Sequence, residues 1–275
     1  LSVFDQDTIR DYRNRFINLH QNHPWTNLED ELFLRKIGAV GVSLDDNKIH
    51  PTIAGLLMFG YEYEIVREFP GYFLDYQERF DESIRWTHRT ISSSGDWSGN
   101  LFDFYFRVIY RLSSDLNIPF VLNGITRVDN TELHVALREA LLNTLVHADY
   151  YGRQGTVIIR TPQMITFSNP GDMRISLRAA VGGGVSDPRN SVLMKMFSLI
   201  GVGERAGMGI PGLLDIWQRL TGIAPIYASQ FSPNRVTVSM QIKMIGDKSV
   251  INGGFGDKSA INSVIGNKSA IKGGN

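Results

Sequence analysis

The chain has no cysteine, no long apolar run and no net charge. Without cysteine, disulfides, thiolate metal sites and thiol nucleophiles are excluded, and a reducing compartment is favoured. No apolar stretch approaches the roughly 18 residues that span a bilayer, so we expect no membrane partner. Lysine plus arginine and aspartate plus glutamate both total 28. This balance argues against an overall positive potential that would attract nucleic acid. Together these features predict a cytoplasmic protein.

What the chain does contain predicts helices on a sheet. Its 275 residues, 43% of them hydrophobic, are enough for a substantial core. Residues 1–60 predict a small helical, winged-helix-like lobe: two helices, the second ending near Gly38, then a short wing and a helix opening at Pro51–Thr52. Residues 61–244 predict a mixed sheet with helices, including a hairpin over 155–171. We therefore expect an α/β fold of the α+β kind, a two-layer sandwich behind a small lobe.

The last part of the chain differs in character from the rest. The phrases GDKSVIN, GDKSAIN and GNKSAIK recur at a spacing of ten residues. Short copies rich in Gly, Ser and Asn bury too little surface to fold alone. Residues 245–275 therefore predict a flexible linker or tail. The chain also begins LSVFDQ, without an initiator Met, which we interpret as a piece of a longer protein.

The stretch REALLNTLVHADYYG, residues 138–152, predicts a buried helix that carries polar groups. At 100° per residue, Glu132, Glu139 and Asn143 fall within about 40° of one another, and His147 lies about 40° further round. Apolar residues occupy most of the remaining circumference, so the helix is buried on most sides and turns a narrow polar stripe to a cleft. The alternative is that these side chains only satisfy neighbouring backbone groups in the core.

Two glycine-containing segments follow this helix. In residues 202–212, VGERAGMGIPG, glycines precede a helix predicted over 213–221, where backbone N–H groups can face a phosphate. The spacing resembles the dinucleotide-binding fingerprint, but it does not follow a strand, so that interpretation fails. The phrase SNPG, residues 168–171, ends an apolar strand and predicts a third element at the edge of the cleft. Residues 172–191 between them are rich in glycine and turn formers.

In this order, the three elements resemble the histidine-kinase-like (GHKL, or Bergerat-fold) ATP-binding domain of gyrase B, MutL and sensor histidine kinases. The resemblance covers about residues 130–240, and it rests on Glu139 followed four residues later by Asn143. It implies ATP and Mg²⁺ as cofactors. Asn143 would hold the Mg²⁺ of the nucleotide through its side-chain oxygen, and Glu139 would orient or deprotonate the attacking water.

The same resemblance implies further nucleotide contacts. The family has an Asp-x-Gly whose carboxylate contacts the adenine amino group, and this chain has Asn169 and Gly171 there. An amide can accept from adenine, but without the strength of a charge-assisted bond. Gly207 and Gly209 match the phosphate-facing loop. Arg189, in DPRN, could reach a phosphate from a lid at Gly182–Gly184, or the phrase could form only a turn.

A second resemblance extends over most of residues 1–242. The phrases PTIAGLLMFG, ALREALLNTLVHADY, SNPG, DPRN and GERAGMGI are similar to those of bacterial transcriptional regulators once labelled as related to the RecG helicase. These proteins usually carry a Schlafen AlbA-type nucleic-acid-binding domain first. The resemblance implies that DNA is bound by domains outside this chain. No helicase motif is present.

Two interpretations of the function follow. The first is an ATP-binding regulatory module of a cytoplasmic transcriptional regulator, with slow Mg²⁺-dependent hydrolysis of ATP left open. The second is a nucleotide-independent scaffold that keeps the fold and serves homodimerisation or protein contact. His147 with Asp149 could also ligate a metal, but with no second His nearby we favour a histidine that bonds backbone at a helix end.

Overall fold

The computed structural model describes residues 2–114, 122–123, 126–127, 132–183, 187–203 and 209–242. These residues belong to one compact unit, residues 1–242. The predicted tail at 245–275, Gly184 of the predicted lid and Gly207 of the predicted phosphate loop lie outside the described residues.

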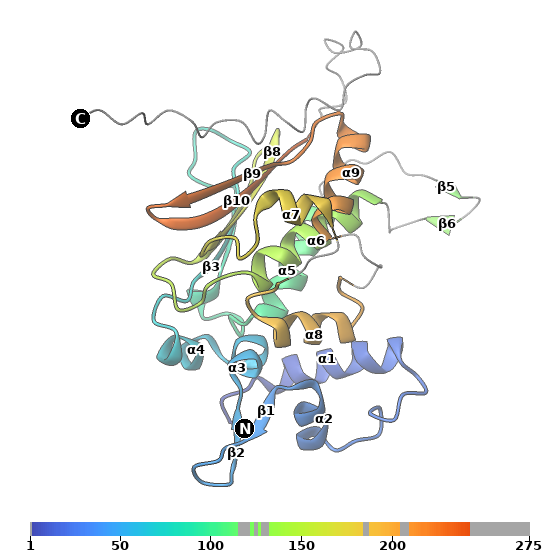
Figure 1. Cartoon of the computed structure of the whole chain (residues 1–275), viewed down its shortest axis with the longest axis vertical. Helices are drawn as coiled ribbons and strands as arrows, with labels where there is room; N and C mark the ends of the chain where they lie inside the picture. Colours follow the sequence, from blue (N-terminus) through green and yellow to red (C-terminus); the bar gives the residue numbers. More distant parts are fainter. Residues whose placement is uncertain are drawn as a thin grey trace. The chain divides into compact units, whose positions relative to one another are not determined.

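Helices and strands are interleaved along the chain (Figure 1). The α-helices are α1 (Gln6–Leu19), α2 (Asp30–Ile37), α3 (Ile53–Phe59), α4 (Glu62–Glu68), α5 (Leu101–Ser114), α6 (Glu132–Val146), α7 (Leu177–Gly182), α8 (Ser191–Leu199) and α9 (Gly209–Thr221). The strands are β1 (Val40–Val42), β2 (Ile49–Pro51), β3 (Leu74–Glu78), β4 (His88–Ile91), β5 (Leu122–Asn123), β6 (Thr126–Arg127), β7 (Thr156–Arg160), β8 (Met164–Pro170), β9 (Ile226–Phe231) and β10 (Asn234–Gln241).

Within the described residues, a mixed sheet of six strands has the order β4-β3-β7-β8-β10-β9. β3 and β7 are parallel, with Tyr76 opposite Ile158, and the other neighbours are antiparallel. A parallel partner cannot follow through a tight turn, so the chain crosses over between β3 and β7, through β4, α5 and α6. β7 and β8 form the predicted hairpin, with Ile158 opposite Phe167.

Helices α6 and α9 lie against one face of this sheet, and α5 packs on α6 (Figure 1). Alternate strand residues point to that face, among them Ile158, Phe167 and Val238, which are buried. The opposite face carries polar pairs such as Arg89 and Asp75, whose charged atoms are 2.9 Å apart. The described fold is therefore the predicted α+β arrangement, with helices layered on a mixed sheet.

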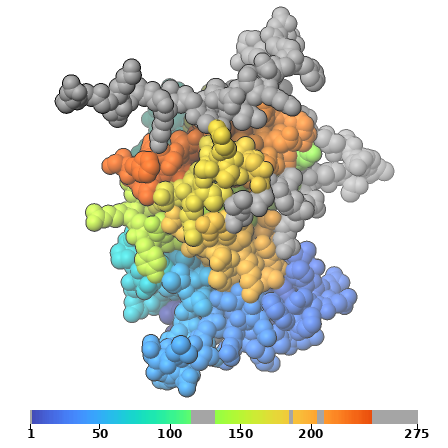
Figure 2. Space-filling model, viewed as in Figure 1, coloured from blue at the N-terminus to red at the C-terminus, as the bar shows by residue number. Residues whose placement is uncertain are grey.

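The N-terminal residues follow the predicted order of two helices, a hairpin and a helix. Thr52 caps α3 by accepting from the Gly55 N–H, and Gly38, at a φ of 93°, ends α2. Figure 2 shows the blue N-terminal residues at one end of the unit, against the orange residues of α8. There the Tyr12 hydroxyl donates to the Met196 carbonyl at 2.8 Å. The boundary near residue 60 stays a prediction, since the core continues across it.

Two segments differ from the expected pattern. Residues 172–191 contain α7, whose cap is the Ser176 hydroxyl, 3.2 Å from the Ala179 N–H. α9 begins at Gly209, four residues before the predicted helix, because Ile210 and Pro211 at its start are compatible with the first turn of a helix.

Candidate functional site

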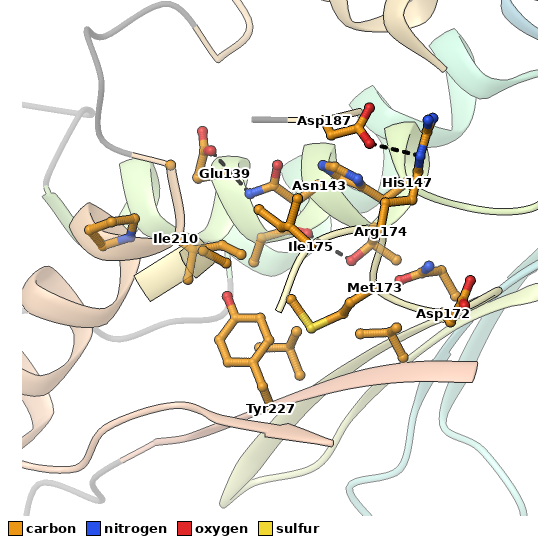
Figure 3. A pocket seen from close by; sticks show the side chains of 18 of the residues that line it. Glu139, Asn143, His147, Asp172, Met173, Arg174, Ile175, Asp187, Ile210 and Tyr227 are labelled. Carbon is orange, nitrogen blue, oxygen red and sulfur yellow. Dashed lines mark hydrogen bonds and ion pairs between the residues drawn. The ribbon is translucent and has the colours of Figure 1, made fainter. Parts of the chain in front are cut away.

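The polar stripe of α6 turns two of its members towards each other. The Asn143 Nδ2 donates to the Glu139 Oε1 at 3.0 Å, one helical turn away (Figure 3). Because an ionised carboxylate can only accept, this bond directs the amide nitrogen to Glu139 and leaves the Asn143 Oδ1 free to accept or to ligate. Glu132, predicted on the same stripe, instead pairs with Arg219 at 2.7 Å on the surface.

The Glu139 carboxyl is held in a poorly solvated place. Burial raises its pKa, and the hydrogen bond from Asn143 opposes that shift without cancelling it. A raised pKa makes the carboxylate a better proton acceptor at neutral pH than an ordinary glutamate is. Perturbed carboxylates in a cavity are typical of functional sites.

A cavity of about 370 Å³ extends along the stripe. That volume lies in the range of small-molecule sites. Three predicted site residues line it besides Glu139: Asn143 from α6, Asn169 from β8 and Gly209 from α9. The fold therefore gathers four of the residues singled out in the sequence around one space, although they are separated by up to 70 positions along the chain.

Asn169 stands at the end of β8 and is buried. Its Nδ2 donates to the Pro170 carbonyl at 3.2 Å, and its Oδ1 makes no hydrogen bond to the described residues. That oxygen is available to a donor in the cavity. Gly171, the other matched position, does not line the cavity. Its φ is 95°, and a Cβ there would come within 3.0 Å of Asp149.

Arg189 also lies beside the cavity rather than in its lining. Its Nη2 pairs with Asp172 at 3.0 Å, and its Nε donates to the His147 carbonyl at 3.3 Å. Arg189 thereby holds the end of α6 against the segment after β8. The arginine that does line the cavity is Arg174, which pairs with Asp187 at 3.0 Å. No pattern around Arg174 in the sequence marked it as a site residue.

His147 is the third stripe residue and lines the cavity, beside the ion pair of Asp187 with Arg174 (Figure 3). Burial lowers its pKa first, then the charge of Arg189, while Asp187 acts in the opposite direction. The imidazole is therefore held neutral at physiological pH. Among the described residues, no cluster of three or more His, Asp or Glu could hold a metal on protein ligands alone.

The remaining lining is mostly apolar and forms the wall opposite the stripe. Tyr227 of β9 and Ile210 of α9 face α6 across the cavity (Figure 3). Burial raises the pKa of Tyr227, and the Glu139 charge adds to the shift. No local pattern in the sequence marks this wall, because Tyr227 lies 88 residues beyond Glu139 and only pairing of β9 with β10 brings it there. Ala140 of α6 lies beside the stripe, and the other apolar lining residues are Met173, Ile175, Ala180, Met194, Pro211, Val236 and Val238.

Comparisons with known proteins bear on the fold. Residues 1–75 match the family described as a domain of unknown function, DUF8451. No curated protein matches the chain. The crystal structure of the DIP2311 protein from Corynebacterium diphtheriae is similar, with a TM-score of 0.63 at 16% sequence identity, over 87% of this chain and 45% of that one. The chain thus spans less than half of that protein, and the likeness shows the fold alone. Among the described helices, none is long and apolar enough to cross a membrane.

Proposed function

We propose that the cavity along α6 binds Mg·ATP or Mg·ADP. The observation that carries the proposal is the hydrogen-bonded pair Glu139 and Asn143, which shares one cavity with Asn169 and with an apolar wall. The polar side suits phosphates and Mg²⁺, because Mg²⁺ in nucleotide sites takes few protein oxygens and keeps phosphate and water ligands. The apolar wall beside Tyr227 suits a flat base.

The residues that line the cavity match Mg·ATP in the hydrogen-bond donors and acceptors that they offer. Asn143 offers one free oxygen to the cation, and Asn169 offers one to the amino group of adenine. Gly209, at the start of α9, brings backbone N–H groups of a helix N-terminus to the same space, where a phosphate is favoured.

Hydrolysis would follow from Glu139. Its carboxylate would take a proton from a water whose oxygen forms a bond to the γ-phosphorus, while the bond from that phosphorus to the ADP oxygen breaks. The raised pKa of Glu139 supports this role, since a base works best when its pKa is near the working pH.

The place of the module in a cytoplasmic transcriptional regulator is part of the proposal and rests on the sequence phrases quoted above. DNA would be bound by domains outside this chain, because the chain itself has no net charge. The exposed wing between β1 and β2 carries Asp45 and Asp46 beside Lys48, which does not favour contact with phosphate.

One observation favours the alternative of a nucleotide-independent scaffold that dimerises or binds another protein. Asn169 stands where the ATP-binding family has Asp, and its amide already donates to its own strand end. A site that lost its carboxylate could have lost its ligand while keeping the fold.

Titration calorimetry with Mg·ADP separates the two. We expect binding with an affinity of micromolar to millimolar order, about −4 to −8 kcal/mol. Metal-free ADP is the ligand control and should bind more weakly, because Asn143 would lack its cation. Absence of both heat and a thermal shift at several millimolar Mg·ADP would reject the nucleotide site and favour the scaffold.

A further inference from the structure

A second cavity lies along the same helix. Its volume is about 570 Å³, and it is bounded by α5, α6, α9 and the segment after α8. Residues Val135, Ala136, Arg138 and Glu139 of α6 line it, whereas the first cavity is lined by Glu139 and the residues after it. The two cavities therefore succeed each other along α6 and meet at Glu139.

The lining of the second cavity combines an apolar body with a cationic rim. Side chains of α5, α6 and α9 provide the apolar part, among them Phe106, Ile109, Val135, Leu213 and Ile216. Arg15 and Arg138 provide two guanidinium groups, and Glu139 provides one carboxylate.

A buried hydroxyl in this lining has no partner among the residues that the structure describes. The Tyr105 side chain is fully buried, and its hydroxyl makes no hydrogen bond to any described residue. The buried hydroxyls of Tyr12, Tyr72 and Tyr150 each donate to a backbone carbonyl at 2.7–2.8 Å. An unmet buried donor is costly, and native proteins rarely leave one without a reason. Burial raises the pKa of Tyr105, so its hydroxyl keeps its proton and needs an acceptor.

Arg15 lies at the exposed rim of the cavity, and Asp11 on the same helix is the nearby negative charge. The Arg15 guanidinium stacks on the Phe106 ring, 3.6 Å from the centroid, and makes no hydrogen bond or ion pair to the residues that the structure describes. Ring stacking fixes the plane of the guanidinium while leaving its N–H groups to face an acceptor. One cavity is therefore lined by a hydroxyl that lacks an acceptor and by a guanidinium that makes no ion pair within the described residues, and a single oxyanion would serve both.

We propose that this second cavity binds a small organic acid with an aromatic or aliphatic body, whose carboxylate accepts from Tyr105 and pairs with Arg15. The acid's body would lie against the side chains of α5 and α9. The site is distinct from the nucleotide cavity and does not depend on nucleotide binding. Glu139 borders both cavities. The carboxylate of the acid would therefore lie at the Arg15 side, away from the like charge of Glu139.

The test uses 2-naphthoate and its uncharged amide, 2-naphthamide, as probes in titration calorimetry without nucleotide. We expect one 2-naphthoate to bind per chain, and the amide to bind at least about tenfold more weakly because a charged acceptor strengthens both hydrogen bonds. Arg15→Gln and Tyr105→Phe should each weaken 2-naphthoate by about fivefold to twentyfold and leave the amide nearly unchanged.

Matched variants separate a binding role from a structural one. Arg107→Gln is the control for Arg15→Gln, because Arg107, on α5, also stacks on a ring, that of Trp97. Tyr72→Phe is the control for Tyr105→Phe, because it removes a hydroxyl that already donates to the Gly99 carbonyl. Neither should change 2-naphthoate binding. Tyr105→Phe should raise the unfolding temperature of the ligand-free chain, since it removes an unpaired donor, whereas Tyr72→Phe should lower it.

Three results would overturn the proposal. The first is no binding of 2-naphthoate up to several millimolar, and the second is equal affinity for the acid and the amide. The third is full affinity in both Arg15→Gln and Tyr105→Phe, which would place the probe elsewhere on the chain.

Discussion

Glu139→Gln tests whether the chain keeps a destabilised carboxylate for use in the cavity. Glutamine has the shape of glutamate and still accepts the 3.0 Å bond from Asn143, so the substitution removes only the charge. Because burial raises the pKa of Glu139, the ionised form is less stable in the folded chain than in water. Removing it should therefore stabilise the protein, as substitutions at functional residues commonly do.

The expected gain is about 0.5–2 kcal/mol, the range for relief at a functional site. For a unit of this size, each kcal/mol raises Tm by about 2–4 °C, so scanning calorimetry at pH 8 should show an increase of roughly 1–8 °C. Any ATP hydrolysis should fall by about 10²–10⁴-fold, because a positioned base is lost.

The pH dependence has a definite sign. The folded chain binds the Glu139 proton more tightly than the unfolded chain does, so the stability from protonation is fully present below the unfolded pKa and is lost as pH rises through the folded pKa. The advantage of Glu139→Gln should therefore be full above the raised pKa and shrink as pH falls through it. Other acids titrate in both proteins and cancel in the difference.

Glu132→Gln is the matched control, on the same helix but exposed and paired with Arg219. It should change stability by less than about 1 kcal/mol, since surface ion pairs contribute little. If Glu139→Gln lowers Tm, or if its gain does not shrink as pH falls into the acid range, the carboxylate is structural and the reasoning about its burial is wrong.

The remaining predictions concern binding and packing. Asn143→Ala should weaken Mg·ADP by about tenfold or more and metal-free ADP far less, while Asn190→Ala, which removes bonds of 3.0 and 2.9 Å to backbone carbonyls, should cost stability without changing nucleotide affinity in calorimetry. Duplex DNA should bind this chain more weakly than micromolar at physiological salt by fluorescence anisotropy; submicromolar binding would place a DNA site within it. Gly55→Ala should lower the free energy of unfolding in urea by about 2–4 kcal/mol, since the added Cβ would lie 1.9 Å from the Ala39 oxygen, whereas Gly182→Ala meets nothing within 4 Å and should be close to neutral. Equal stability of the two glycine variants would contradict the close approach of α3 to the Ala39 carbonyl.

Several elements could be predicted because their signals are local. Thr52 caps α3 and Gly38 ends α2 through contacts within a few residues, so their letters alone indicate the ends. The hairpin β7–β8 joins neighbouring segments, and its alternation of apolar residues shows which face is buried. The four-residue spacing of Glu139 and Asn143 likewise places them on one side of a helix whatever surrounds it.

The sequence by itself determined the helices, the hairpin and the pairing of Glu139 with Asn143, because these depend on periods of two and 3.6 residues and on caps. Only the tertiary structure decided which polar residues share a cavity. Glu132 and Glu139 have nearly the same direction on the helix, yet Glu132 is exposed and pairs with Arg219 of α9, whereas Glu139 is covered by the segments that enclose the cavity. Arg174 and Tyr227 reach the cavity through strand pairings and ion pairs with distant segments, and no local pattern encodes such contacts. That the Tyr105 hydroxyl has no partner among the described residues is likewise a property of its surroundings, since the packing of α5 against α6 and the Phe197 ring of α8 decides which groups surround it.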